Sequence, residues 1–200
     1  MKLSLTFPTP IWSDNFPDIN NAELSEVILE EKCADKGMVL HELDGWRTAS
    51  QDIFKDDKFK SLLSHIETKL KEVCSQMEIN PKYNLGQGVG WAYITTKGGW
   101  HPPHCHPDGF LSCVYYIDVP EDSDSHLVFD DPRHQRSMLS EHDTYMNTNE
   151  LNHSRIPINP KTGDFHIFPS WFNHFVTPSM SDENRIMITL NYPLKEIGTS

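Results

Sequence analysis

A change of hydrophobic period near residue 85 is the feature that most constrains how this 200-residue chain folds. Before it, one segment spaces its apolar side chains three and four positions apart, as an amphipathic helix does. These side chains are Phe59, Leu62, Leu63, Ile66, Leu70, Val73 and Met77. After it, apolar residues alternate with small or polar ones, or form short β-branched and aromatic runs between turns, as strands do. The sequence therefore predicts a helical first part followed by strands and turns.

The rest of the chain can be divided in the same way. An extended lead-in over residues 6–12 precedes a helix to about residue 34, which Asn20 or Asn21 caps and Gly37 stops. Residues 45–54 look irregular, and strands are predicted at 89–95, 110–119, 126–129, 165–168, 175–177 and 185–192. Helices backing a closed antiparallel sheet predict an α+β, barrel-like fold. We expect one domain over residues 1–200, with a helical part at 1–84 and a strand core at 85–195.

Composition excludes several classes of function. A formal net charge of −12 argues against a nucleic-acid surface, because phosphate binding requires clustered Lys and Arg. The sequence has no apolar run long enough to cross a bilayer and no signal-peptide pattern, so we expect a cytoplasmic protein without a membrane partner. Its four cysteines form no C-x-x-C pair, which predicts reduced thiols rather than a zinc ribbon or a disulfide framework.

Candidate metal ligands lie in the stretch after residue 99. If this stretch is extended, alternation places His104, His106 and Asp108 on one face. Farther along, His174 offers a distant imidazole, and Arg185 opens an apolar strand. Two histidines and one carboxylate can hold iron while leaving positions for an oxo-acid and oxygen. The order of these residues is the one that a non-heme iron oxygenase needs.

Four segments resemble a group of small 2-oxoglutarate/Fe(II)-dependent oxygenases that are distantly related to prolyl hydroxylases. The segments are FPTPIW (7–12), HCHPDGFLSCVYYI (104–117), GDFHIFPSWFNH (163–174) and RIMITLN (185–191). The resemblance implies a double-stranded β-helix of jelly-roll or cupin-like form, with N-terminal helices and with iron at its open end. It also implies two cofactors, Fe(II) and 2-oxoglutarate as cosubstrate.

The resemblance carries roles onto individual positions. It implies that His106, Asp108 and His174 hold the iron and act in catalysis. It implies that Arg185 holds the distal carboxylate of 2-oxoglutarate and that Tyr116 assists cosubstrate binding. Close relatives keep both histidines of the H-x-H motif but vary at the position of Asp108, so a ligand set with His104 remains open. We favour Asp108 because an anionic ligand lowers the charge of a ferrous site.

Arg185 is the residue that distinguishes three hypotheses about the function. Its planar fork suits a carboxylate, whereas an ordinary salt bridge to Asp182 or Glu183 would leave it without a role in binding. The first hypothesis is a dioxygenase that hydroxylates an unidentified substrate and releases succinate and CO2. The second is a cupin-like metal barrel without an oxo-acid, and the third is a β-rich interaction module with incidental histidines.

Substrate and assembly are less constrained by the sequence. We expect a small-molecule or peptide substrate, with no nucleic acid, and a homodimer is one assembly left open. Residues 133–154 form a long polar connection, which predicts a flap over the site or a disordered segment.

Overall fold

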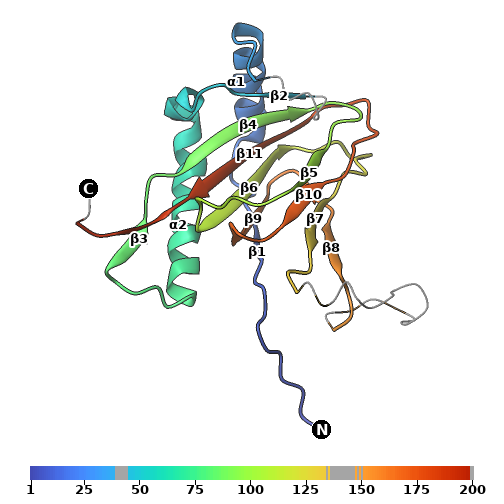
Figure 1. Cartoon of the computed structure of the whole chain (residues 1–200). Helices are drawn as coiled ribbons and strands as arrows, with labels where there is room; N and C mark the ends of the chain where they lie inside the picture. The colour runs from blue at the N-terminus through green and yellow to red at the C-terminus, as the bar shows by residue number, and fades with distance from the viewer. Residues whose placement is uncertain (39–44, 134, 136–146, 148, 150, 199–200) are drawn as a thin grey trace.

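Two antiparallel sheets face each other, and two helices cover the outer face of the larger one (Figure 1). The computed structural model describes residues 1–38, 45–133, 135, 147, 149 and 151–198. Within these residues the larger sheet runs in the order β1 (Trp12–Asn15), β9 (Asp164–Pro169), β6 (Leu111–Asp118), β11 (Arg185–Tyr192), β4 (Val89–Thr95) and β2 (Gly45–Arg47). The smaller sheet runs β5 (His101–His104), β10 (His174–Val176), β7 (Leu127–Asp130) and β8 (Arg155–Ile158). A third pair joins β12 (Leu194–Glu196) to β3 (Tyr83–Leu85).

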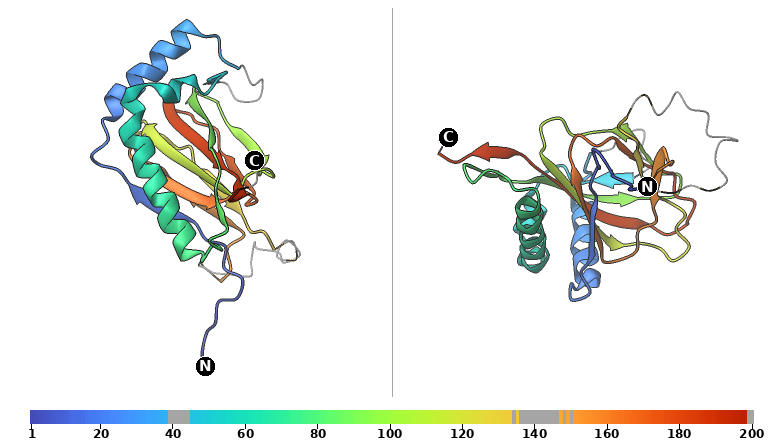
Figure 2. Two further views of the ribbon diagram at one scale, coloured as in Figure 1. Left: turned by 90° about the vertical axis from the view of Figure 1, so that its left-hand side faces the viewer. Right: turned by 90° about the horizontal axis from the view of Figure 1, so that it is seen from below.

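The helices lie where the hydrophobic spacing predicts them. Helix α1 (Asn21–Ala34) begins after Asn20, whose side chain accepts a hydrogen bond from the Glu23 backbone N–H. Two short 3-10 turns, at Asp52–Lys55 and Asp57–Phe59, lead into α2 (Lys60–Gln76). Figure 2 shows both helices packed along the same face of the larger sheet. Each helix buries one apolar stripe, with Leu24, Val27 and Ile28 on α1 and Leu62, Ile66, Leu70 and Val73 on α2.

Strand alternation divides the interior into two cores. On β4, Ala92 and Ile94 point toward the helices and belong to the outer core. Tyr93, between them, points the other way and packs against the inner core between the two sheets. The fully buried members of that inner core are Val114, Tyr116, Leu127, Phe129, Phe168, Phe172, Val176 and Met187. The larger sheet is therefore apolar on both faces, and the site described below lies on its inner side.

Several short strands depart from the prediction. Residues 45–54 were expected to be irregular, but residues 45–47 form the edge strand β2 beside β4. The paired strands β3 and β12, and the edge strand β8, also lack predicted counterparts. These strands are three or four residues long, too short for an alternating pattern to be read. The part expected to be helical thus also supplies both edges of the larger sheet, β1 and β2.

The long polar connection at 133–154 was predicted to be a flap or a disordered segment. Most of it lies outside the described residues, so this remains a prediction. Among the helices that the structure describes, none has the length and apolar character needed to cross a membrane.

Candidate metal and oxo-acid site

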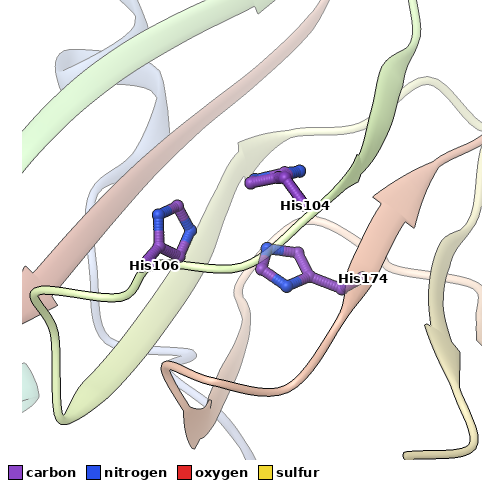
Figure 3. Close-up of side chains that lie close together, drawn as sticks. All are labelled: His104, His106 and His174. Carbon is purple, nitrogen blue, oxygen red and sulfur yellow. The ribbon is translucent and has the colours of Figure 1, made fainter.

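Three histidines converge between the two sheets (Figure 3). His104 ends β5 and His174 begins β10, and the two residues are direct partners in the antiparallel pairing of these strands. Directly opposed residues on one face of a sheet bring their side chains together, and the two imidazole ring centres lie 4.4 Å apart. His106 follows two residues after the end of β5. Ring nitrogens of His104, His106 and His174 all lie within 4.8 Å of one another.

The backbone around His106 is held by a tight turn. Its N–H donates to the Ser170 carbonyl oxygen at 2.8 Å, and its own carbonyl accepts from the Gly109 N–H at 3.0 Å. A Cβ atom at position 109 would lie 2.5 Å from Ser170 Oγ, so glycine is required for this close approach. The turn therefore returns His106 toward the strand pair instead of continuing along the line of β5.

The protonation of the ring nitrogens fits a metal site. Nδ1 of His104 lies 2.8 Å from the Pro102 carbonyl oxygen, and Nδ1 of His174 lies 2.8 Å from that of Phe172. A carbonyl only accepts, so both Nδ1 atoms carry the proton and both Nε2 atoms present a lone pair. This is the hydrogen-bonding pattern that orients most metal-binding histidines.

Burial keeps two of these imidazoles neutral. It lowers the pKa of His106 to about 4 and that of His174 to about 3, and nearby imidazoles add to both shifts. A neutral imidazole is the form that binds a metal ion. The donor set therefore fits a divalent transition metal, with three nitrogen ligands and no carboxylate among them.

Asp108 is not part of this group. Strand β5 ends at His104, so the alternation that would place His104, His106 and Asp108 on one face does not continue to Asp108. Pro107 and Asp108 lie in the turn, and the Asp108 side chain is exposed. The ligand groups that the structure brings together are those of the alternative with His104.

Arg185 is buried on the inner side of β11. Its side chain is 1 % exposed, and Nη1 donates to Ser125 Oγ at 2.7 Å. Nε and Nη2 are buried without a hydrogen-bond partner among the described residues. The salt bridge considered from sequence is absent in that part of the chain, because Asp182 pairs with Lys97 at 2.7 Å and Glu183 is exposed. A buried cation without an anion is costly, so the geometry suits an anionic ligand.

Tyr116 lies near Arg185 and also lines the cavity of the three histidines. Its ring lies 6.0 Å from the Arg185 guanidinium carbon, and burial raises its pKa to about 12, so the phenol is neutral. Tyr116 lines a cavity of about 50 Å³ that the three histidines also line. Alternate residues of β11 after Arg185 line the same cavity, namely Met187, Thr189 and Asn191. A volume of this size holds only a few water molecules, so an oxo-acid can enter only if lining side chains move.

A larger cavity lies elsewhere among the described residues. It has a volume of about 940 Å³ and lies on the outer side of the molecule, between α2, β3 and the end of β11. No histidine lines it, and its walls include both positive and negative side chains, such as Lys71 and Glu67. Convergent ligand groups indicate a site better than size does, and they converge on the smaller cavity.

Sequence reasoning missed several residues at the site. Ser125, the hydrogen-bond partner of Arg185, lies between two predicted strands, at 110–119 and 126–129, where no pattern marks it. Ser112 Oγ donates to Asn191 Oδ1 at 2.6 Å and also contacts Ser170 Oγ at 2.8 Å at the cavity wall. Asn191 could have been found, because it alternates with Arg185 on a predicted strand.

Comparisons with known proteins agree with this geometry. A family model described as "Putative 2OG-Fe(II) oxygenase" matches residues 90–191, and no curated protein sequence matches the chain. Among solved structures, the chain resembles a prolyl-4-hydroxylase from Pseudomonas putida, with a TM-score of 0.64, 11% identity and 92% coverage of each chain. It also resembles a Trichoplax adhaerens prolyl hydroxylase in complex with a hypoxia inducible factor peptide, with a TM-score of 0.59, 12% identity and coverage of 92% and 83%.

A third neighbour carries ligands. HygX from Streptomyces hygroscopicus, with nickel and 2-oxoglutarate bound, gives a TM-score of 0.60 at 12% identity and covers 92% of this chain and 82% of that one. At these identities the likeness establishes the fold, and it confirms the predicted α+β architecture with a double-stranded β-helix core. The family match extends from β4 to β11 and includes all three histidines and Arg185. The chain therefore belongs to this family of 2OG-Fe(II) oxygenases.

Proposed function

We propose that this chain is an Fe(II)- and 2-oxoglutarate-dependent dioxygenase that hydroxylates a bound substrate. In the overall reaction one oxygen atom of O2 enters the substrate as a hydroxyl group and the other enters succinate, while CO2 is released. His104, His106 and His174 are the proposed iron ligands, and Arg185 is the proposed anchor of 2-oxoglutarate. The proposal replaces Asp108 by His104 in the ligand set because of the nitrogen positions described above.

The observation that carries the proposal is the unpaired guanidinium of Arg185. Two of its nitrogens are buried and lack partners among the described residues, on the strand whose alternate residues line the histidine cavity. A planar fork of N–H donors binds a carboxylate through two parallel hydrogen bonds. A metal barrel without an oxo-acid would have no use for a buried cation at this place.

The protein residues have separate tasks in this scheme. The bound iron would supply the chemistry of oxygen activation and oxo-acid decarboxylation, as a redox-active centre. The three imidazoles would hold the ion, with His104 and His174 using Nε2 because their Nδ1 atoms donate to backbone carbonyls, and would leave the remaining coordination positions to ligands. Tyr116 keeps its proton and offers a neutral hydroxyl beside Arg185. The aromatic inner core, with Phe129 and Phe168 near His174, keeps water from that side of the site.

The test is a titration of the ferrous protein with 2-oxoglutarate in the absence of air. The iron–oxo-acid chelate gives a visible charge-transfer band, and Arg185→Met should weaken the 2-oxoglutarate affinity read from it. A charge-assisted bidentate contact contributes about 2–4 kcal/mol, which corresponds to a loss of about 30-fold to 1,000-fold. Succinate release measured with candidate substrates then tests turnover.

Two variants serve as controls for this titration. Arg185→Lys keeps the charge but loses the planar guanidinium group, and it should lower the 2-oxoglutarate affinity less than Arg185→Met does. Arg155→Met removes an arginine that is already paired with Asp130 at 2.9 Å, away from the histidines, and should bind as the wild type does. An Arg185→Met protein with unchanged 2-oxoglutarate affinity would show that the guanidinium has another purpose.

The cupin-like metal barrel remains as a second candidate because of one observation. Three histidines without a carboxylate are also a donor set for catalytic zinc. A protein that binds zinc through the three histidines but gives no 2-oxoglutarate band with ferrous iron would favour this alternative.

A further inference from the structure

A second arginine faces the inner side of the larger sheet. Arg47 lies on β2, where it pairs with Tyr93 of β4. Its neighbour Trp46 is buried in the outer core beneath the helices. Alternation therefore directs Arg47 to the opposite side, the same side as Tyr93 and the histidine cavity.

The guanidinium of Arg47 is held by aromatic rings rather than by an anion. Its central carbon lies 5.0 Å from the ring centre of Trp91 and 6.0 Å from that of Tyr93. Nη2 contacts the sulfur of Met38 at 2.7 Å, and Nε is buried and has no hydrogen-bond partner in the described part of the chain. Stacking occupies the face of the guanidinium and leaves its N–H edge for a ligand.

Arg47, like Arg185, has no acidic partner among the residues that the structure describes. The sequence has 29 acidic residues against 17 basic ones, yet none of the acidic side chains in the described ranges pairs with Arg47. Other arginines do have such partners, because Arg133 pairs with Asp131 and Arg155 with Asp130. Arg155 also stacks on a ring, that of Phe175 at 5.3 Å. Stacking and ion pairing are thus compatible in this protein, and within the described ranges Arg47 makes the first kind of contact without the second.

Arg47 adjoins the histidine cavity. A small cavity of about 10 Å³ beside Arg47 is lined by Tyr93 and His101, and both residues also line the cavity that holds the three histidines. Ring contacts join the two places, with 5.3 Å between the centres of Tyr93 and His101 and 5.7 Å between those of His101 and His104. A carboxylate at Arg47 would therefore lie next to the rings of Tyr93 and His101, and these lining side chains would have to move to admit it.

We infer that Arg47 anchors a carboxylate of the prime substrate, so that the enzyme acts on small molecules that carry a free carboxylate group. The inference rests on the proposed function and adds the substrate class to it. Arg185 would then hold the carboxylate of the cosubstrate and Arg47 that of the substrate. The aromatic walls formed by Trp91 and Tyr93 would lie against the apolar part of the substrate next to its carboxylate.

The experiment uses matched pairs of compounds that differ only in this charge. The full chain is saturated with nickel(II) and 2-oxoglutarate, which fills the Arg185 site without permitting turnover. Free amino acids and the corresponding C-terminal amides are then added at millimolar concentration, and binding is measured by saturation-transfer NMR. We expect acids to bind and their amides not to bind.

Variants assign the effect to Arg47. Arg47→Met and Arg47→Gln should each weaken acid binding by about 10-fold or more, because a charge-assisted hydrogen bond is lost. Arg47→Lys should recover part of it. Arg155→Met, which removes a stacked but ion-paired arginine, should bind acids as the wild type does. Urea unfolding of each variant verifies that the fold is intact.

Three results would overturn the inference. They are equal binding of acids and amides, acid binding that survives in both Arg47→Met and Arg47→Gln, and a panel in which no acid binds. In each of these cases the iron–oxo-acid band of the wild type still decides the proposed function separately. If that band is absent, the oxygenase proposal fails, whatever the acids and amides show.

Discussion

The three histidines contribute nitrogen donors and no charge. Two of them are fixed by the strand pairing of β5 with β10, and the third by the turn that follows β5. Because burial holds His106 and His174 neutral, a divalent ion among these rings keeps its full positive charge. Compensating charge would then come from the ligands that bind the ion, and a dianionic oxo-acid is well suited to supply it.

Single substitutions distinguish the two ligand sets. We expect His104→Ala to weaken ferrous iron binding by about 10-fold or more, since even residues that only orient a ligand can have effects of this size. Asp108→Ala should leave the iron affinity unchanged, because the Asp108 side chain is exposed in the turn. Calorimetric titration of the metal-free protein in the absence of air measures both. Loss of iron with Asp108→Ala and retention with His104→Ala would restore the carboxylate to the ligand set.

The sequence predicted part of this site and missed the rest for identifiable reasons. The H-x-H segment, His174 and Arg185 stand out because each adjoins a strand with a clear pattern. The structure places Asp108 outside the histidine group, because β5 ends at His104 and the alternation does not extend to Asp108. Arg47 gave no signal, since its strand is three residues long and its aromatic partners come from another strand.

Among the elements, length decided what could be predicted. Helix α2 carries four buried apolar residues at helical spacing, and strand β11 has five buried apolar or aromatic residues, so both were identified. The short strands β2 and β8 form because β4 and β7 offer free N–H and C=O groups at the sheet edges, and β3 and β12 form by pairing with each other. Local sequence does not encode the presence of such a neighbour.

The helical layer should support the sheet without taking part in ligand binding. Leu70 of α2 is 2 % exposed and packs in the outer core, away from the histidines. We expect Leu70→Ala to lower the free energy of unfolding by about 2–5 kcal/mol, as measured by urea denaturation. The 2-oxoglutarate affinity of the folded protein should not change. The half-buried Leu63 provides the comparison, because Leu63→Ala should destabilise less, and a loss of affinity in either variant would contradict a purely supporting layer.

For the molecule as a whole, the buried imidazoles predict how stability depends on pH. An exposed histidine in the unfolded chain has a pKa near 6.5, while burial lowers the pKa of His174 to about 3 in the folded protein. Between these values the unfolded state binds a proton that the folded state excludes. The metal-free protein should therefore lose stability as pH falls below about 6.5, by at most about 1.4 kcal/mol per pH unit for this group, and show no dependence from it above that pH.

Urea denaturation of the metal-free protein at pH 7.5, 5.5 and 4.5 measures this dependence. His174→Gln should reduce the slope between the two acidic values. His65→Gln, which alters an exposed histidine on α2, should not. A slope that is the same in the wild type and in His174→Gln would mean that other groups dominate acid unfolding.

The direct pairing of His104 with His174 also has a consequence for biosynthesis. A slip of one residue between β5 and β10 would turn His174 to the opposite face of the sheet and disperse the three nitrogens. During synthesis β5 emerges from the ribosome well before β10, so a nascent chain can present two of the histidines but not the third. An ion that is held by all three binds only the chain with correct register and stabilises it by mass action. The supply of metal in the cell would then favour chains with the correct register of β5 and β10, in addition to providing the ion for catalysis.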